Sequence, residues 1–298
     1  MLVAGVDVGS VATKVAIIKD DTFFFRAAPT GWSPRQAGAQ VLQDLLSELG
    51  FEKEQLDFVV ATGYGRVSLE YADKRVTEIT CHARGAAYLV PGCSLVIDIG
   101  GQDSKAIKID KEGQVLDFVM NDKCAAGTGR FLQVIAAALG NDVSELSELA
   151  ADKMPVALNS MCAVFAESEV IGLLASGHDK GEIVAGLHHS IARRIAGMVG
   201  RLGPSDRVIF TGGVAKNESL RRCLEDVLGM EVVVPEMCQM AGALGAALIA
   251  QGYCDEGNSV KRANRKTMTS NSTLSDAEGY QNNIHDSTHV NKKEFEVI

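Results

Sequence analysis

The sequence predicts an α/β protein built from two related lobes, and two observations support this prediction. Short runs rich in β-branched residues alternate along the chain with longer segments whose apolar residues recur at helical spacing. In addition, the segment VDVGSVATKVAI, which begins at Val6, aligns with the segment IDIGGQDSKAIK, which begins at Ile97. A repeated unit of strand, glycine turn and strand indicates two copies of one motif, so we expect two lobes of similar construction.

Seven runs are expected to form strands because each is short, apolar and enriched in β-branched residues. In chain order they are residues 2–8, 13–18, 58–62, 94–99, 105–109, 207–211 and 231–234. Helical patterns separate these runs, and the clearest cover residues 33–49, 129–139, 165–174, 182–199, 219–228 and 241–250. Such a mixture is typical of an α/β fold.

The two copies of the repeat suggest how the chain divides. We assign residues 1–93 together with 241–254 to the first lobe and residues 94–240 to the second. From residue 255 the composition changes, because 15 of the 44 residues to 298 are Ser, Thr or Asn and apolar residues become sparse. Such a segment buries too little apolar surface to offset its ordering entropy, so residues 255–298 are predicted to be a disordered tail.

Composition and charge exclude several classes of function. The chain has 298 residues, of which 46% are apolar, so it can bury a substantial core. Its net charge of -9 argues against binding to nucleic acid or to anionic membranes. No apolar stretch approaches the roughly 20 residues that span a bilayer, and the N-terminus lacks the pattern of a secretory signal. We therefore expect a cytoplasmic protein without a nucleic-acid or membrane partner.

The two glycine turns of the repeat are candidate phosphate-binding sites. A strand that ends in Asp-x-Gly can bring backbone amides and a carboxylate to a polyphosphate and its hydrated Mg²⁺. Gly9-Ser10 forms one such turn, and Gly100-Gly101-Gln102 forms the other. Lys14 adds positive charge near the phosphates. The candidate acids that hold Mg²⁺ or position water are Asp7, Asp98 and Asp103.

A third segment completes this pattern. The sequence IFTGGVAKN, residues 209–217, predicts a strand that leads through a Gly-Gly turn into a helix, where the backbone can pass close to a base or a ribose. The sequence contains neither GxxxxGK[ST] nor a strand followed by GxGxxG, which disfavours a P-loop or a dinucleotide-binding fold. Two phosphate turns followed by TGG resemble the superfamily of sugar kinases, actin and heat-shock chaperone ATPases. The resemblance implies two ribonuclease-H-like lobes, the actin-like ATPase fold, with ATP in the cleft between them.

Two of the cysteines are distinguished by their surroundings. Cys124 and Cys162 each precede a helical pattern and are followed by small residues, whereas the other five have no matching flanks. A helix N-terminus carries about half a positive charge, which favours a thiolate or an anionic cluster. Two buried structural cysteines would be the ordinary interpretation. Two thiolates are also half of the usual ligand set of an iron-sulfur cluster, and a twofold axis would supply the other half.

Six segments together resemble one family within that superfamily. GVDVGSVATK, ATGYGR, IDIGGQDSK, NDKCAAGTGRF, CAVFAESEV and TGGVAKN occur in this order between residues 5 and 217. They are similar to the activators of 2-hydroxyacyl-CoA dehydratases among the BadF/BadG/BcrA/BcrD-type ATPases. The resemblance implies that Cys124 and Cys162 of two subunits hold one 4Fe-4S cluster. It also implies that ATP contacts Ser10, Val11, Ala12, Thr13, Lys14, Gly101, Gln102, Gly212, Gly213 and Asn217.

The function implied by this resemblance is ATP-dependent one-electron transfer by a homodimer. The electrons would come from ferredoxin or flavodoxin and pass to a 2-hydroxyacyl-CoA dehydratase or a related acyl-CoA reductase, whose substrate the sequence does not reveal. One alternative is a small-molecule kinase of the N-acetylhexosamine type on the same fold, with Asp103 as general base. Another is a noncatalytic ATP-driven binding module. The kinase alternative leaves the surroundings of Cys124 and Cys162 unexplained.

Overall fold

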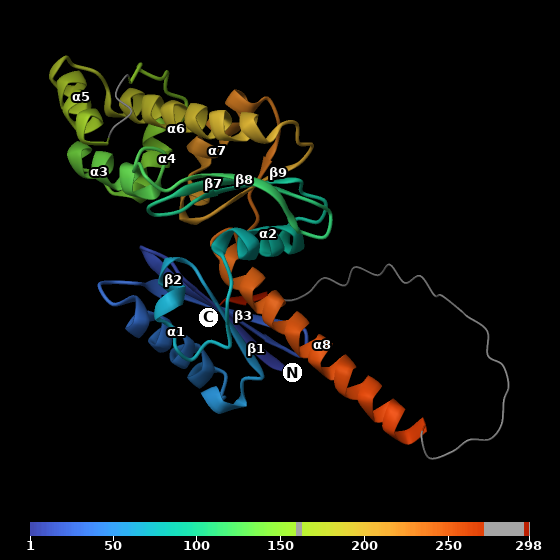
Figure 1. Ribbon diagram of the computed structural model, residues 1–298. Helices are drawn as coiled ribbons and strands as arrows, with labels where there is room; N and C mark the ends of the chain where they lie inside the picture. The colour runs from blue at the N-terminus through green and yellow to red at the C-terminus, as the bar shows by residue number, and fades with distance from the viewer. Residues whose placement is uncertain (159–162, 271–294, 298) are drawn as a thin grey trace.

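The computed structural model describes residues 1–158, 163–270 and 295–297, which form two mixed sheets surrounded by helices (Figure 1). The strands are β1 (Leu2–Val8), β2 (Ala12–Lys19), β3 (Thr22–Pro29), β4 (Phe58–Thr62), β5 (Lys74–Arg75), β6 (Leu95–Ile99), β7 (Ser104–Ile109), β8 (Val115–Asn121), β9 (Val208–Thr211), β10 (Val232–Val233) and β11 (Phe295–Val297). The helices are α1 (Pro34–Glu48), α2 (Glu78–Leu89), α3 (Gly129–Leu139), α4 (Leu146–Ala150), α5 (Ala163–Ala175), α6 (Lys180–Leu202), α7 (Glu218–Leu228) and α8 (Ala241–Ser270). Four 3₁₀ turns complete the described elements: η1 (Lys53–Gln55), η2 (Tyr64–Ser68), η3 (Val143–Glu145) and η4 (Gly213–Lys216).

The two sheets share one topology. The first has the strand order β11-β3-β2-β1-β4-β5, and the second has the order β10-β9-β6-β7-β8. In the first, β1, β2 and β3 are antiparallel neighbours, and β4 pairs in parallel with β1. In the second, β6, β7 and β8 are antiparallel neighbours, and β9 pairs in parallel with β6. The internal repeat of the sequence therefore corresponds to two lobes of the same construction, as predicted.

The alternation of side chains along the strands divides the core into layers. On one face of the first sheet, Val6 and Val8 belong to a buried cluster that includes Leu45 of α1. On its other face, Val3 belongs to a cluster that includes Ala243 of α8. Because successive residues of a strand point to opposite faces, β1 can be buried on both sides only if it is apolar nearly throughout, as its sequence is.

The second sheet is layered in the same way. Its outer face packs on α3, α6 and α7, with Leu95 and Ile97 in one cluster with residues of these helices. Its inner face packs on α2, because Val96 shares a cluster with Ala83 and Ala86. Helices α2 and α8 therefore lie against each other between the two sheets (Figure 1). Each of these two helices covers the inner face of one lobe.

Most predicted elements occur where the sequence placed them. All seven predicted strands are present, with ends within one residue of the expected positions. Three larger elements were missed, namely β3, β8 and α2. The apolar residues Leu116 and Phe118 of β8 are exposed, so this edge strand shows no alternation of buried and exposed positions. Helix α2 buries mainly small residues, such as Ala83 and Gly85, and these give only a weak apolar periodicity.

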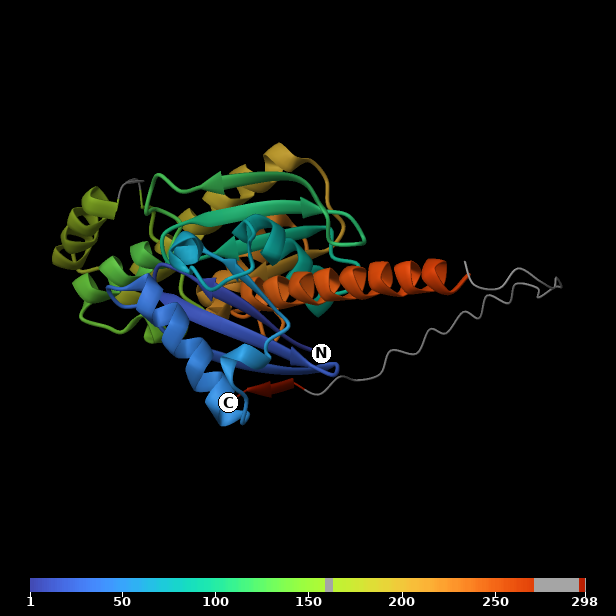
Figure 2. The same ribbon diagram turned by 60° about the horizontal axis from the view of Figure 1, so that its bottom comes forward.

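The segment predicted to be a disordered tail is in part structured. Helix α8 continues past residue 255 to Ser270 and projects beyond both sheets (Figure 2). Strand β11 pairs in parallel with the edge strand β3. No proline, which would interrupt a helix, occurs between residues 241 and 270. Residues 271–294 lie outside the described part of the chain. Among the described helices, none combines the length and the apolar character that a transmembrane span requires.

Candidate functional site

The two glycine turns of the repeat have the same hydrogen-bonded form. In the first lobe, the N–H of Gly9 donates to the carbonyl of Ala12 at 3.1 Å, which closes the turn between β1 and β2. In the second lobe, the N–H of Gly100 donates to the carbonyl of Asp103 at 2.9 Å, which closes the turn between β6 and β7. We call residues 9–12 the first phosphate hairpin and residues 100–103 the second. Both line one cavity of about 460 Å³, a size suited to a nucleotide.

The strand-end aspartates occupy equivalent places in the two lobes. Asp7 is paired in register with Lys14, and its carboxylate lies 3.3 Å from the ammonium of that lysine. Asp98 is likewise paired in register with Lys105, at 3.2 Å. Lys105 also lies 2.8 Å from the carboxylate of Asp103. The three predicted acids therefore line the same cavity, each close to a lysine of its own lobe.

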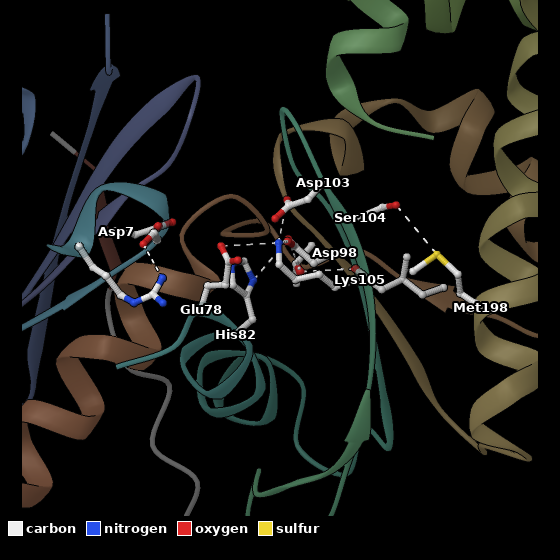
Figure 3. A network of polar contacts seen from close by, with 12 residues as sticks. Asp7, Glu78, His82, Asp98, Asp103, Ser104, Lys105 and Met198 are labelled. Carbon is white, nitrogen blue, oxygen red and sulfur yellow. Dashed lines mark hydrogen bonds and ion pairs between the residues drawn. The ribbon is translucent and has the colours of Figure 1, made fainter. Parts of the chain in front are cut away.

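Helix α2 adds two residues that the sequence analysis did not select. Glu78 lies 3.7 Å from the ammonium of Lys105, and His82 Nδ1 lies 3.3 Å from the carboxylate of Asp98 (Figure 3). Lys105 could have been predicted as a site residue, because it aligns with Lys14 in the repeat. No comparable signal existed for Glu78 and His82, because they reach the site only through the packing of α2 between the lobes.

Electrostatics keep Asp98 and Lys105 of this buried cluster ionised. Burial by itself would raise the pKa of Asp98, but the charges of His82, Lys105 and Lys14 outweigh it and lower the pKa to about 2. Burial would likewise lower the pKa of Lys105, but its carboxylate neighbours raise it above its usual value. The pKa of Glu78 is raised, mainly by burial. Asp98 therefore presents a permanent negative charge to the cavity.

Two glycines allow the turns after β4 and β9 to pass close to these acids. Gly212 has φ 92° and ψ 174°, a conformation that is essentially restricted to glycine. A Cβ atom there would lie 2.4 Å from the carbonyl oxygen of Ile99 and 2.9 Å from Asp98 Oδ1. Gly63 has nearly the same conformation, and a Cβ there would lie 2.3 Å from Asp7 Oδ1. The TGG turn thus has a counterpart in the first lobe, within ATGYGR.

The cavity collects nearly all of the residues predicted to contact ATP or its metal. Those that line it are Asp7, Ser10, Val11, Ala12, Lys14, Asp98, Gly101, Gln102, Asp103, Gly212, Gly213 and Asn217. Thr13 does not line it. Its buried hydroxyl lies 3.0 Å from the hydroxyl of Thr30, which in turn donates to the carbonyl of Gly9. Thr13 therefore supports the first phosphate hairpin from behind.

One end of the cavity is formed by the second lobe. Several of its residues were not selected from the sequence: Leu132, Gln133, Val143, Ser144, Ser147, Val214, Lys216 and Gln239. At this end Asn217 acts as the N-cap of α7, because its side-chain oxygen accepts from the N–H of Leu220 at 2.9 Å. Its amide nitrogen lies 3.0 Å from Nε2 of the buried His188. Only tertiary packing of α3, η3 and α4 brings these segments together.

Cys124 lies in the loop between β8 and α3, away from the cavity lining. Its side chain is partly buried, and its backbone carbonyl accepts from Asn121 Nδ2 at 2.9 Å. Cys162, the other predicted cluster ligand, lies outside the described residues. It immediately precedes Ala163, where α5 begins, and α5 packs on α3. Among the described residues, no group of three or more His, Cys, Asp or Glu could hold a metal ion.

Comparison with known proteins identifies relatives of the whole domain. The model of the BadF/BadG/BcrA/BcrD ATPase family matches residues 4–250. The (R)-2-hydroxyglutaryl-CoA dehydratase activating ATPase of Acidaminococcus fermentans is 47% identical over 249 residues, covering 83% of this chain and 95% of that protein. The activator of lactoyl-CoA dehydratase of Anaerotignum propionicum is 45% identical over 254 residues, covering 84% and 97%.

Solved structures confirm the predicted fold class. The activator of 2-hydroxyisocaproyl-CoA dehydratase from Clostridium difficile, solved with bound ADPNP, is 41% identical with a TM-score of 0.80, over 87% of this chain and 97% of that chain. A ROK-family glucokinase from Streptomyces griseus superposes with a TM-score of 0.50 at 15% identity over 85% of this chain, which shows the fold alone.

Proposed function

Because the chain belongs to the BadF/BadG/BcrA/BcrD ATPase family, we propose that it couples ATP hydrolysis to one-electron transfer into a 2-hydroxyacyl-CoA dehydratase or a related acyl-CoA reductase. The names of its relatives support this class of partner. One structural observation carries the proposal. Phosphate hairpins from both lobes, one of which carries the buried Asp103, meet two buried strand-end carboxylates at a single cavity, as an ATPase that closes around its nucleotide requires.

The described residues suggest a division of labour in ATP hydrolysis. The backbone of the two hairpins would bind the phosphates, and Lys14 would balance part of their charge. Asp7 and Asp98 line the cavity from opposite lobes and are the residues that would hold hydrated Mg²⁺. Asp103 is a further candidate for orienting the attacking water. Lys105 keeps Asp98 and Asp103 in place through its two short contacts.

The donor chemistry of the chain fits half of a 4Fe-4S site. Cys124 provides a thiol at a loop beside the N-terminus of α3, and Cys162 directly precedes α5, which packs on α3. Two thiolates from each of two subunits would complete the usual set of four. A cluster held there supplies a one-electron carrier whose potential responds to charge, hydrogen bonding and solvent exposure. We propose ferredoxin or flavodoxin as the electron donor.

The kinase alternative has no specific observation in its favour. A kinase on this fold would use Asp103 as general base, yet the carboxylate of Asp103 lies 2.8 Å from the ammonium of Lys105. The likeness to the glucokinase concerns the fold alone. The homodimer and the cytoplasmic location expected from the sequence stay predictions.

The proposed function makes a prediction about iron content. Protein purified without oxygen should contain about four iron and four sulfide per two chains, because each chain supplies half of the ligands. Cys124→Ala should lose the iron and the ability to activate the dehydratase while it still binds ATP. Cys223→Ala is the matched control and should retain both, since Cys223 is partly buried and burial raises its pKa to about 11. Four irons per single chain would rule out a shared cluster.

A second prediction separates hydrolysis from the cluster. Asp98→Asn removes a buried negative charge from the cavity and should lower the rate of ATP hydrolysis about 100-fold, the usual effect of losing one preorganised electrostatic contact. Iron content and the visible spectrum should not change, because Asp98 lies on β6 and not in the loop of Cys124. Activation of the dehydratase by chemically prereduced protein with Mg·ATP is the readout. Full activation without hydrolysis would contradict the proposed coupling.

A further inference from the structure

The second phosphate hairpin and the loop of Cys124 are joined directly by backbone hydrogen bonds. The N–H groups of Gly129 and Arg130, the first residues of α3, donate to the carbonyls of Gly100 and Gly101, each at 2.8 Å. The first N–H groups of a helix have no partner within the helix, and here the hairpin provides it. Thr128, the residue before α3, does not cap the helix with its side chain. Movement of the hairpin must therefore move the start of α3.

The approach of hairpin and helix depends on a glycine. A Cβ atom at Gly129 would lie 3.1 Å from the carbonyl oxygen of Gly100 and 3.5 Å from the Cα of Gly101. Such spacing leaves little room for a side chain between the two segments. The contact is therefore close packing as well as hydrogen bonding.

The loop that carries Cys124 is held at both ends by side chains. Asn121, the last residue of β8, donates from Nδ2 to the carbonyl of Cys124 at 2.9 Å and to the carbonyl of Ala126 at 3.1 Å. At the other end, the hydroxyl of Thr128 donates to the carbonyl of Ala125 at 2.6 Å. The carbonyls of three consecutive residues are thus hydrogen-bonded. The loop therefore has little freedom to move independently of the residues at its two ends.

Helix α6 fixes the same loop from outside. Arg194 Nη2 donates to Asn121 Oδ1 at 3.3 Å. Its aliphatic part also crosses Gly127, because a Cβ at that glycine would lie 3.0 Å from Arg194 Cδ. Gly127 has φ +85°, a conformation that suits glycine. Asn121 therefore uses its amide group in both directions, toward the loop as a donor and toward α6 as an acceptor.

We propose that Asn121 and Arg194 couple the Cys124 loop to the second phosphate hairpin, so that the loop responds to the nucleotide bound between the lobes. This inference rests on the proposed function only in taking the bound ligand to be ATP or ADP and Cys124 to be a cluster ligand. Asn121 is a positioning residue. It does not line the nucleotide cavity. It acts by holding the Cys124 loop to α6 through Arg194 and to the end of β8, where Asn121 is paired in register with Ser104, the residue after the second phosphate hairpin. The linkage is reciprocal, so a change at the loop also changes nucleotide affinity.

The test measures amide hydrogen exchange in the full chain with Mg·ADPNP and with Mg·ADP. In the wild type, exchange at residues 124–128 should differ about fivefold or more between the two nucleotides, the lower end of typical allosteric coupling. Asn121→Asp has the same shape but replaces the NH₂ donor by an acceptor that repels the carbonyls of Cys124 and Ala126. It should abolish this difference at residues 124–128, while ADPNP still protects residues 100–103.

Three further variants make the result specific. Arg194→Ala removes the support from α6 and should reduce the nucleotide difference in the loop, and it serves as the second variant should Asn121→Asp not fold. Arg193→Ala and Asp122→Asn change neighbouring exposed residues and should behave as the wild type. The proposal would be overturned if both Asn121→Asp and Arg194→Ala kept the wild-type difference in exchange between the two nucleotides. It would also be overturned if exchange at residues 124–128 of the wild type were the same with both nucleotides. Iron content is measured on the same samples. Failure of the proposed function would appear there, independently of the exchange result.

Discussion

His188 lies on α6 with 1% of its surface exposed, and it fixes one residue of the nucleotide cavity. Asn217 donates from Nδ2 to His188 Nε2, which must therefore be unprotonated. The oxygen of the same amide caps α7. Both the nitrogen and the oxygen of the Asn217 amide group are thus hydrogen-bonded within the protein. Asn217 therefore has a structural role in addition to its predicted contact with ATP. His188 Nδ1 has no hydrogen-bond partner among the described residues.

This arrangement predicts how stability depends on pH. Burial lowers the pKa of His188 to about 4, whereas an unfolded histidine titrates near its usual value of 6.5. Between these values the unfolded chain binds more protons than the folded chain, so stability should fall as the pH is lowered from 6.5 to 4. The loss from this residue should reach at most about 3 kcal/mol. This pH dependence can be measured as the free energy of urea unfolding of the wild type and of His188→Gln at pH 7, 6, 5 and 4.5. The variant should be less stable at pH 7, and its free energy of unfolding should depend less on pH. Identical slopes of unfolding free energy against pH in the two proteins would contradict the assignment of this dependence to His188.

At the scale of elements, the contact between α2 and α8 determines how closely the lobes approach. A Cβ atom at Gly245 of α8 would lie 1.8 Å from the carbonyl oxygen of Cys81, and one at Gly85 of α2 would lie 2.0 Å from that of Ala241. The backbones of the two helices therefore touch without intervening side chains. On its other side α8 rests on Gly5 of β1, where a Cβ would lie 2.2 Å from the carbonyl oxygen of Ala243. These glycines set the spacing between the lobes.

Two alanine substitutions on one helix should consequently have opposite effects. Gly245→Ala would force α2 and α8 apart and should destabilise the fold by about 1–3 kcal/mol, as overpacking of a close contact usually does. Gly252→Ala is the matched control, because its side chain would point into open space and glycine is a poor helix former. It should stabilise the chain by about 0.5–1 kcal/mol. Urea unfolding at constant pH compares the two, and a neutral Gly245→Ala would show that the helices can separate freely.

At the scale of the whole molecule, the two phosphate hairpins meet each other across the cleft. A Cβ atom at Gly101 of the second hairpin would lie 2.3 Å from Val11 Cγ2 and 3.1 Å from Ser10 Oγ of the first. Val11 is 43% exposed and lines the cavity. The two hairpins are therefore in direct contact, although their residues are 90 positions apart in the sequence.

This contact predicts a double-mutant effect on nucleotide affinity. Gly101→Ala should push the hairpins apart and weaken binding of Mg·ADPNP about tenfold, equal to about 1.4 kcal/mol. Adding Val11→Ala removes the branched methyl groups that the new Cβ would meet, so the double variant should recover most of the affinity. Isothermal titration calorimetry of the two single variants and the double variant gives the coupling energy. Strictly additive losses would show that the hairpins do not depend on this contact.

The repeated strand-turn-strand units could be predicted from the sequence, because their alternation, their glycines and their strand-end aspartates are local features of short segments. The sequence therefore predicted the seven strands, the two phosphate hairpins and all three acids that the cavity brings together. It also distinguished Cys124 by its neighbours, although the shared cluster stays a prediction. Thr13 was predicted to contact ATP as part of the continuous stretch 10–14. In the structure its hydroxyl lies against that of Thr30, 17 positions away in the chain, and the short motif does not reveal this partner.

Only the tertiary structure revealed the contributions of α2, α6 and the segments after α3. Glu78 reaches Lys105 and His82 reaches Asp98 because α2 packs between the sheets. His188 reaches Asn217 because α6 packs on α7. These helices are rich in small residues or carry a single polar residue at a buried position, so their periodicity contains no sign of a site. Contacts between residues far apart in the chain depend on how whole elements pack, and this packing is a property of the complete core that no short segment of sequence contains.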